Sequence, residues 1–285
     1  MIAALLTAAV LASSVPTHSI LFVGNSFTFG ALSDVMTYRK DSVTDLNGDG
    51  MGGVPALFKR FADESGLRYR VSLETAAGQS LTWHLANKSA VIGRPWDAVV
   101  LQQYSILDPD KPGDPSETIT AARGLAHLLG RNNPGIDISL VATWTRPDLI
   151  YPAGKHWSGQ PVERMAVDLR KADDKVRAAV PSIDRVIPVG QAFNCAIARG
   201  LADPNPYDGV TPGKIDLWAS DHYHASTYGY YLEALTIFAV VTHTDPRKLG
   251  PAEGAARDLK ISSPVAVKLQ DIAFRVAARG RCGSR

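Results

Sequence analysis

Short apolar runs alternate with amphipathic segments along most of this 285-residue chain. The runs are apolar nearly throughout, which is typical of strands buried on both faces of a sheet. They cover residues 18–23, 69–74, 98–102, 137–143 and 185–189. Segments with helical spacing of apolar residues lie between and after them. These segments cover residues 55–65, 116–129, 161–180, 226–242 and 264–279. The order predicts an α/β fold with a central parallel five-stranded sheet, right-handed crossovers and helices on both faces.

The composition indicates a single globular domain. Hydrophobic residues make up 45% of the chain and charged residues 20%, which is ordinary for a globular protein. No linker rich in Pro, Ser or Gly and no block of charge divides the chain, so we predict one domain over residues 15–285. The formal net charge of +2 gives no reason to expect a nucleic-acid partner. The sequence leaves the oligomeric state open.

The first residues have the pattern of an export signal. Residues 1–14 form a mostly apolar stretch that ends in small residues, as in a secretory signal peptide. The stretch is too short to cross a bilayer as a helix, so we expect no stable membrane insertion. It lacks the usual basic residues, and an apolar extension packed on the domain is the alternative. A signal peptide predicts a secreted or periplasmic protein, in which Cys195 and Cys282 permit one disulfide.

A serine stands where the first predicted strand ends. Residues 20–30, ILFVGNSFTFG, form an apolar run that stops at Gly24 and places Ser26 just beyond it. Ligands of open parallel sheets bind at the carboxyl ends of the strands. Ser26 is therefore a candidate nucleophile, although a polar turn or a helix cap would produce the same local pattern.

A glycine and several polar residues follow the other predicted strands. Gly78 follows the second strand, where the absence of a side chain lets a backbone N–H face a ligand. The amides of Gln102 and Gln103 follow the third strand. Further along, Asp221 precedes His224 by three residues, so the carboxylate can bind Nδ1 and leave Nε2 free to accept a serine proton. A turn glycine, satisfied amides and a helix cap are the structural alternatives.

These residues resemble the motif blocks of the SGNH, or GDSL-like, hydrolases. Residues 24–26, GNS, are similar to block I of that family, Gly78 to its block II glycine, and Asp221-x-x-His224 to its block V. The motifs follow the family's order over residues 20–241. The resemblance implies a three-layer α/β/α flavodoxin-like fold.

The resemblance also implies a serine esterase mechanism that needs no cofactor and no metal. Ser26 would attack the ester carbonyl, His224 would act as the general base, and Asp221 would orient His224. The backbone N–H groups of Ser26 and Gly78 would stabilise the oxyanion.

Two positions depart from the family pattern. Asn25 stands where Asp is usual in block I, and the Gly-x-Asn of block III is missing. Gln102 lies near the place of block III, and its amide can donate the N–H that asparagine supplies. We therefore predict Gln102 as the third oxyanion donor, with Gln103 as the alternate.

Segments expected to overhang the site mix aromatic rings with basic side chains. Such side chains suit sugar rings better than a lipid acyl chain, because they stack on the ring and hydrogen-bond its hydroxyls. We therefore predict a short acyl group, above all acetyl, on a carbohydrate or similar polar alcohol. Packing of the tryptophans in the core is the alternative. The predicted substrate-binding residues are Asn25, Trp83, His84, Gln103, Trp144 and Arg146.

Other functions are compatible with the same sequence. A lysophospholipase or thioesterase would use the same mechanism on a longer acyl chain. A metallohydrolase would use His222 and His224, with His84 or His156 as a third ligand. A non-catalytic carbohydrate-binding protein is a further alternative, because fold does not imply function.

One loop begins like a calcium-binding loop. Its first residues, at 45–50, follow the pattern Asp-x-Asn-x-Asp-Gly. Position twelve of the pattern is Ala56, where a calcium loop needs a bidentate Glu. The sequence therefore favours a glycine-rich surface loop here.

Overall fold

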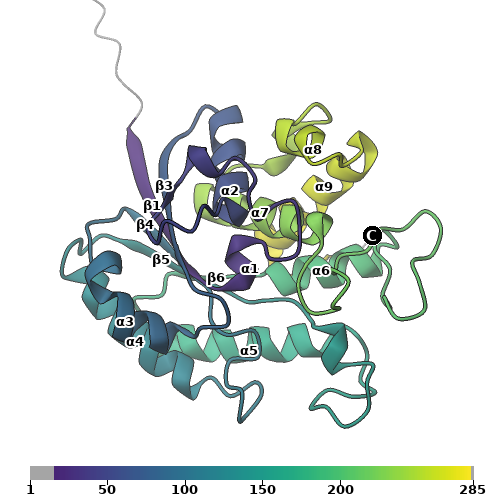
Figure 1. The fold of residues 1–285 in the computed structure, drawn as a ribbon, viewed down its shortest axis with the longest axis horizontal. Coiled ribbons are helices and arrows are strands. Elements are labelled where there is room, and N and C mark those ends of the chain that lie inside the picture. Colours follow the sequence, from purple (N-terminus) through teal and green to yellow (C-terminus); the bar gives the residue numbers. More distant parts are fainter. Residues whose placement is uncertain (1–15, 284–285) are drawn as a thin grey trace, which may run out of the picture.

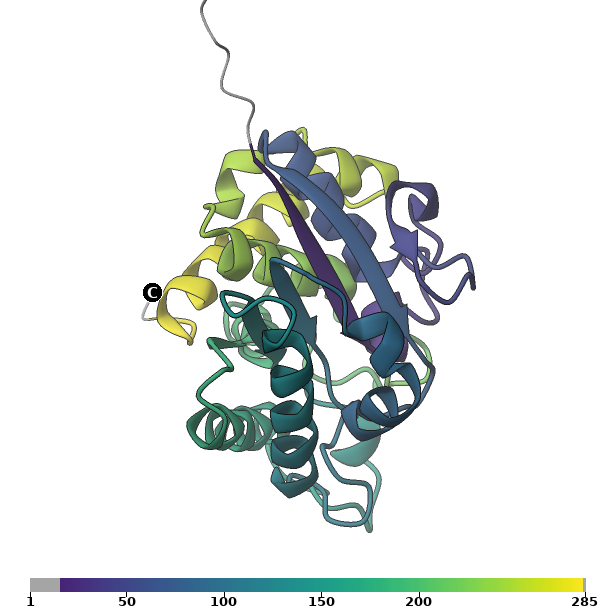
Figure 2. The same cartoon turned by 90° about the vertical axis from the view of Figure 1, so that its left-hand side faces the viewer.

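The computed structural model describes residues 16–283. One six-stranded sheet runs in the order β2-β3-β1-β4-β5-β6, and all neighbouring strands are parallel. The strands are β1 (Thr17–Gly24), β2 (Thr44–Asp45), β3 (Arg68–Thr75), β4 (Ala98–Leu101), β5 (Asp137–Val141) and β6 (Arg185–Ile187). Figure 2 shows the two longest, β1 and β3, side by side.

The five predicted strands are confirmed, but the predicted strand count is wrong because the sheet has six strands. The additional strand, β2, pairs only Thr44 and Asp45 with β3. A strand this short and this polar produces no apolar run, so the sequence pattern does not show it. The parallel arrangement and the helices on both faces are as predicted.

Helices flank the sheet and fill its connections. They are α1 (Ser26–Phe29), α2 (Gly53–Glu64), α3 (Leu81–Ile92), α4 (Ser116–Gly130), α5 (Arg164–Ala179), α6 (Val189–Ala198), α7 (Thr227–Thr242), α8 (Gly254–Asp258) and α9 (Ser263–Arg279). The five predicted helices correspond to α2, α4, α5, α7 and α9. The sequence pattern does not show α3, because its few buried residues, Leu81, His84 and Ile92, form no continuous apolar stripe.

Helices cover both faces of the sheet (Figure 1), and alternate residues of β1 pack in two different hydrophobic clusters. In β1, Ile20 and Phe22 pack with α2, α6, α7 and α9, whereas Leu21 and Val23 pack with α3, α4 and α5. Both faces of the sheet are therefore covered, which explains why the strands are apolar without alternation.

The strand register brings several loops to one edge of the sheet. Gly24 at the end of β1 pairs with Thr75 at the end of β3, and Val23 pairs with Leu101 at the end of β4. The segments that follow these three strands therefore begin at the same edge. This edge carries the residues that the sequence singles out.

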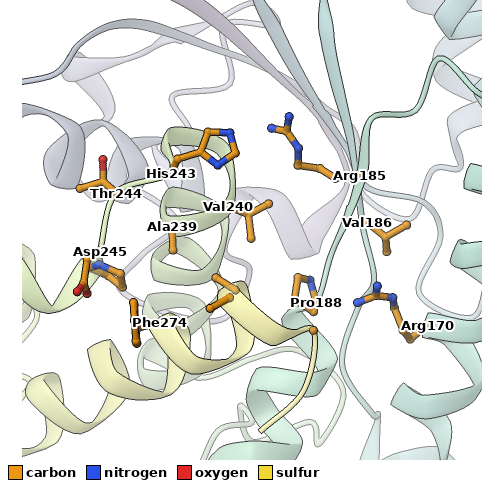
Figure 3. A pocket seen from close by; sticks show the side chains of 14 residues that line it. Arg170, Arg185, Val186, Pro188, Ala239, Val240, His243, Thr244, Asp245 and Phe274 are labelled. Carbon is orange, nitrogen blue, oxygen red and sulfur yellow. The ribbon is translucent and has the colours of Figure 1, made fainter. Parts of the chain in front are cut away.

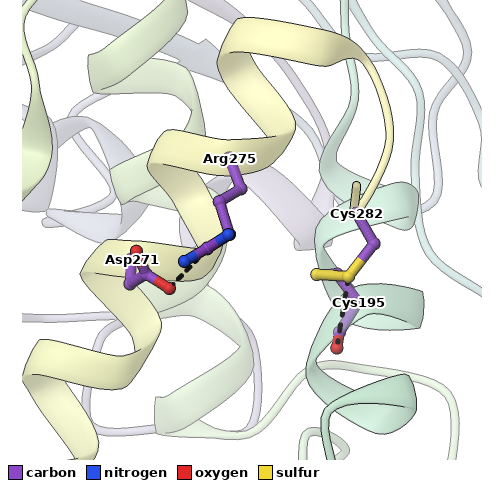
Figure 4. Close-up of a disulfide and its surroundings, with 4 residues drawn as sticks. All are labelled: Cys195, Asp271, Arg275 and Cys282. Atoms are coloured by element: carbon purple, nitrogen blue, oxygen red, sulfur yellow. Dashed lines mark hydrogen bonds and ion pairs between the residues drawn. A yellow bond between two sulfur atoms is a disulfide. The ribbon is translucent and has the colours of Figure 1, made fainter. Parts of the chain in front are cut away.

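A disulfide ties the end of the chain to the domain (Figure 4). Cys195 in α6 and Cys282 beyond α9 are bonded, with their Cα atoms 5.0 Å apart. Beside it on α9, Arg275 forms an ion pair with Asp271 at 2.6 Å. The disulfide that the sequence permits is thus formed.

The predicted signal peptide, residues 1–14, lies outside the described residues. Within residues 16–283, every helix falls short of the length and apolar character that a membrane span requires.

Candidate active site

The nucleophile turn joins β1 to the short helix α1. Asn25 caps this helix, because its side-chain oxygen accepts a hydrogen bond from a backbone N–H of the first turn at 3.2 Å. The amide nitrogen of Asn25 donates to the carbonyl of Gln79 at 3.1 Å. Asn25 is 3% exposed, so it supports the turn and is wrongly predicted to contact substrate. Ser26 follows as the first residue of α1, at the carboxyl edge of the sheet.

A buried glutamine fixes the turn from the neighbouring strand. Gln102 Oε1 accepts hydrogen bonds from the backbone N–H of Asn25 and from the hydroxyl of Thr28, each at 3.1 Å. A Cβ on Gly24 would lie 2.2 Å from the Thr28 hydroxyl oxygen and 2.8 Å from Gln102 Oε1. The glycine is therefore required by close packing.

Three side chains form one hydrogen-bonded chain across the site. His224 Nε2 lies 2.9 Å from Ser26 Oγ, and His224 Nδ1 lies 2.6 Å from Asp221 Oδ2. A proton on Nδ1 donates to the carboxylate and leaves Nε2 as the acceptor for the serine hydroxyl. This is the arrangement of a nucleophile, a general base and an orienting carboxylate.

The carboxylate of Asp221 is stabilised in its ionised form. Burial disfavours ionisation, but hydrogen bonds from the imidazole and backbone N–H of His224 and from the N–H of Tyr223 outweigh it. The pKa of Asp221 is therefore held below its ordinary value. Its second oxygen, Oδ1, accepts both backbone N–H groups at 3.0 Å.

Backbone pairing holds the loop that carries the base. The N–H of Ala219 donates to the carbonyl of His224 at 2.8 Å. Ser226 caps α7, and its hydroxyl donates to the carbonyl of Asp216 at 2.7 Å. The loop is thus closed on itself immediately before a buried helix.

Two backbone N–H groups are available as oxyanion donors. Among residues 16–283, neither the N–H of Ser26 nor that of Gly78 has an acceptor. Gly78 has φ +69°, a backbone conformation that glycine adopts without strain. A Cβ there would meet nothing within 4 Å, so the backbone angle explains the glycine.

The two glutamines after β4 do not point their donors at the nucleophile. Gln102 Nε2 donates to the main-chain carbonyl of Gln103. Gln103 Nε2 donates to Thr118 Oγ1 at 3.1 Å, and its Oε1 accepts the N–H groups of Leu81 and Tyr104, both at 2.8 Å. Each glutamine is 1% exposed. The geometry therefore contradicts the predicted donor role of Gln102 and the substrate contact of Gln103, because both amides support neighbouring backbone.

Two further predicted substrate residues are buried. Trp144 is 0% exposed and lies between the rings of Phe27 and Phe193, with centroids 4.0 and 5.1 Å away. His84 is also 0% exposed and its Nδ1 lies 2.5 Å from Glu74 Oε2. Neither side chain can meet a substrate, so these two predictions are wrong. An aromatic or imidazole ring beside a strand end looks the same in sequence whether it packs inward or outward.

Arg146 lies near His224, but its guanidinium is already engaged by other side chains. Its guanidinium binds Asp148 through Nε at 3.1 Å and through Nη2 at 2.7 Å, and Nη1 donates to Ser105 Oγ at 3.0 Å. The guanidinium carbon also lies 3.6 Å from the centroid of the Tyr223 ring. That ring in turn lies 4.3 Å from the ring of His224. Arg146 thus borders the site through Tyr223.

The sequence interpretation misses two tyrosines that pack on the histidines of residues 222–224. Tyr223 packs against His224, and Tyr207, 46% exposed, lies with its ring 4.2 Å from that of His222. Tyr223 could have been found from its place between two histidines. Tyr207 could not, because it comes from a loop before the catalytic segment.

The metal-site alternative receives no support from the arrangement of ligands. No group of three or more His, Cys, Asp or Glu side chains within residues 16–283 could hold a metal ion. Both ring nitrogens of His224 already have partners. The ring of His222 packs on Tyr207 instead.

A cavity of about 480 Å³ lies beside β6 (Figure 3). Its lining comes from β6 and the proline after it, from α5, and from the ends of α7 and α9 with the turn that follows α7. Its two arginines are each paired with a carboxylate, Arg170 with Asp174 at 2.9 Å and Arg185 with Asp137 at 2.8 Å. None of Ser26, Asp221 and His224 lines this cavity.

Solved structures share this fold. A protein of the DUF4886 family from Bacteroides uniformis has a TM-score of 0.67 and 17% identity, covering 95% of this chain and 98% of its own. A candidate GDSL-like lipase from Parabacteroides merdae has a TM-score of 0.53 and 16% identity, covering 80% of this chain and 98% of its own. A candidate SGNH hydrolase from Slackia heliotrinireducens has a TM-score of 0.50 and 19% identity, covering 79% and 100%. No protein-family model and no curated protein matches the sequence.

Proposed function

We propose, from the SGNH-hydrolase fold of the chain, that it is a serine esterase. The observation that carries the proposal is the continuous hydrogen-bonded chain from Ser26 through His224 to Asp221. Among residues 16–283, the backbone N–H groups of Ser26 and Gly78 have no acceptor, and Asn25 joins the Ser26 turn to the Gly78 loop through the carbonyl of Gln79. A serine in a mere turn or cap would need neither the imidazole nor the carboxylate behind it.

The reaction follows from the positions of these groups. Ser26 Oγ attacks the carbonyl carbon of the ester, and its proton passes to His224 Nε2. The oxygen of the tetrahedral intermediate takes hydrogen bonds from the N–H groups of Ser26 and Gly78. Collapse of the intermediate expels the alcohol, which receives the proton from His224. Water then attacks the acyl-enzyme by the same route and releases the acid.

The substrate we propose is a short acyl ester, above all an acetyl ester, of a carbohydrate or similar polar alcohol. Trp83 is partly exposed on α3, directly after the Gly78 loop; Tyr223 packs against His224, and Tyr207 packs against the nearby His222. These side chains combine aromatic faces with polar atoms, which suits sugar rings. A lysophospholipase or thioesterase activity is the second candidate, because it requires the same triad.

We also propose that the protein is secreted or periplasmic. The disulfide between Cys195 and Cys282 supports this location, because disulfides persist in oxidising compartments and are rare in the cytosol.

Replacing Ser26 by alanine tests the proposed function. The wild type should hydrolyse esters with acyl chains of two carbons fastest, and Ser26→Ala should lose roughly six orders of magnitude in kcat, as in other serine hydrolases. A fluorophosphonate should label the wild type and not the variant. Wild-type turnover by Ser26→Ala would refute the mechanism. Loss of wild-type activity on chelation would indicate a metallohydrolase, and absence of both activity and labelling would leave a binding protein.

A further inference from the structure

A second hollow lies beside the oxyanion loop. Its volume is about 420 Å³, within the range of roughly 300–1,000 Å³ that small-molecule sites occupy. Thr75, Ala76 and Ala77 form one wall and lead directly to Gly78. The end of α1 contributes Phe29, three residues after the nucleophile. The hollow is therefore next to the catalytic centre and contains none of the triad.

The opposite wall is a loop held rigidly by hydrogen bonds. Asp45 accepts the N–H of Asn47 through Oδ1 and the N–H of Met51 through Oδ2, both at 3.0 Å. The amide nitrogen of Asn47 donates to the carbonyl of Thr75 at 2.8 Å, and Lys88 donates to the amide oxygen at 2.8 Å. The carboxylate that resembled a calcium ligand thus organises the loop instead.

The aromatic wall comes from α3. Trp83 follows the capping serine of this helix, Ser80, whose side chain accepts its N–H. The next residue, His84, is buried against Glu74 at 2.5 Å, and Glu74 accepts the amide of Asn47 at 3.3 Å. The indole is therefore presented by a helix that is anchored to the sheet and, through Glu74, to the opposite loop.

The lining indicates an uncharged, hydroxyl-rich ring. Trp83, Phe29 and Met51 supply apolar and aromatic surface. The exposed carboxylate of Asp49 has no hydrogen-bond donor or ion-pair partner among the residues that the structure describes, so it can accept from ligand hydroxyls. The formal charges of Asp49 and Lys88 cancel, which favours a neutral ring over an anionic headgroup. Aromatic faces beside fixed polar groups recognise the apolar faces and the hydroxyls of a sugar.

We propose that this hollow is a glycosyl subsite, which holds a neutral sugar unit of the alcohol portion of the ester while the acyl group lies at Ser26. This inference rests on the proposed esterase function and adds where the alcohol is bound. Trp83 is its stacking platform and Asp49 its hydroxyl acceptor. The sugar chain then runs from the nucleophile across the Gly78 loop toward α3.

The test compares Trp83→Leu with Trp83→Tyr on two substrates. One is an O-acetylated xylo-oligosaccharide, and the other is vinyl acetate, whose alcohol portion is too small to reach the hollow. Trp83→Leu should lower kcat/KM for the oligosaccharide about tenfold, mainly through KM, because a stacking contact of this kind is lost. It should leave vinyl acetate within about twofold. Trp83→Tyr keeps an aromatic face and should retain most of the activity on both.

Binding without turnover separates this inference from the proposed function. Calorimetry on Ser26→Ala should detect the deacetylated oligosaccharide, and Ser26→Ala/Trp83→Leu should bind it about tenfold more weakly. Equal losses on both substrates, or binding that Trp83→Leu leaves unchanged, would overturn the subsite and leave the esterase intact. If hydrolysis rates rise with acyl length and Trp83→Leu lowers them, the hollow binds the acyl chain. That result would also overturn the glycosyl subsite. If no ester is hydrolysed, the esterase proposal fails. Calorimetry on the wild type and on Trp83→Leu with the same oligosaccharide still decides whether the hollow binds a sugar.

Discussion

Under the proposed mechanism, Gln102 supports catalysis without touching the substrate. Its amide oxygen accepts two hydrogen bonds from the nucleophile turn, at Asn25 and Thr28. Because the turn is buried, these donors have no access to water. The position of Ser26 therefore depends on a residue that directly follows the adjacent strand β4.

Truncating Gln102 distinguishes this role from that of an oxyanion donor. Gln102→Ala should lower the free energy of unfolding by about 1–3 kcal/mol, because it leaves a buried N–H and a buried hydroxyl unpaired. Urea denaturation measures this change, with kcat measured in parallel. An undiminished stability together with a kcat loss of about two to three orders of magnitude would instead restore the donor role predicted from the sequence.

A buried glutamate makes stability depend on pH. Glu233 in α7 is 1% exposed, and its Oε2 has no hydrogen-bond partner within residues 16–283. Burial raises the pKa of Glu233 well above its ordinary value of 4.5. Below pH 4.5 the folded and unfolded chains both hold the proton. Above it the unfolded chain releases the proton first, so stability falls as pH rises toward the folded pKa.

Glu233→Gln should remove this dependence. The variant should gain stability over the wild type as pH rises from 5 to 8, with a slope of at most about 1.4 kcal/mol per pH unit. Urea denaturation across this range measures the gain. Asp110→Asn changes an exposed carboxyl and is the control that should show no growing difference. If the gain in stability were largest near pH 5, the raised pKa of Glu233 would be contradicted.

At the scale of elements, Trp144 connects the segment that carries Ser26 to the loop that carries His224. Its ring stacks on Phe27, the residue after the nucleophile, at 4.0 Å between centroids. Its Nε1 donates to the carbonyl of Tyr223, the residue before the base, at 3.2 Å. The segment that follows β5 therefore sets the distance between α1 and the loop before α7.

Trp144→Phe isolates the hydrogen bond, because the phenyl ring keeps the stacking. The variant should lower kcat by up to about tenfold, since one hydrogen bond is worth about 1 kcal/mol, with KM nearly unchanged. Trp96→Phe is a matched control, because that indole donates to Ile92 O at 2.9 Å and lies outside the loop that carries His224. Equal kcat losses in both variants would show a general effect of indole removal.

The sequence predicts elements where a local pattern carries them. Buried strands are apolar without interruption, and Asp221 and His224 lie three positions apart in one local turn. Both features can therefore be recognised from a short stretch of sequence. The inward packing of Trp144 and His84 depends on which side of a loop faces the core, which no local pattern records. The same holds for Gln102, whose partners lie 77 and 74 positions away.

For the whole molecule, the disulfide is the one covalent link between α6 and the C-terminal segment within residues 16–283. It closes a loop over a sequence separation of 87. Cys282→Ser should lower the free energy of unfolding by about 2–4 kcal/mol, because the unfolded chain is no longer constrained. Thermal or urea denaturation measures the loss, and kcat on a short acetate ester should stay unchanged. Reducing agent should reproduce the effect in the wild type and add nothing in the variant.

The triad itself is assembled from distant parts of the chain. Ser26 and His224 are separated by 198 positions, and the loop before the histidine is exposed throughout residues 207–213. A chain cut in this loop would divide into a fragment that carries the nucleophile and a fragment that carries its base. Neither fragment alone holds a working pair, so turnover would appear only where the two reassociate. Under the proposed mechanism, ester hydrolysis would then report the reassociation of two polypeptides cut within residues 207–213.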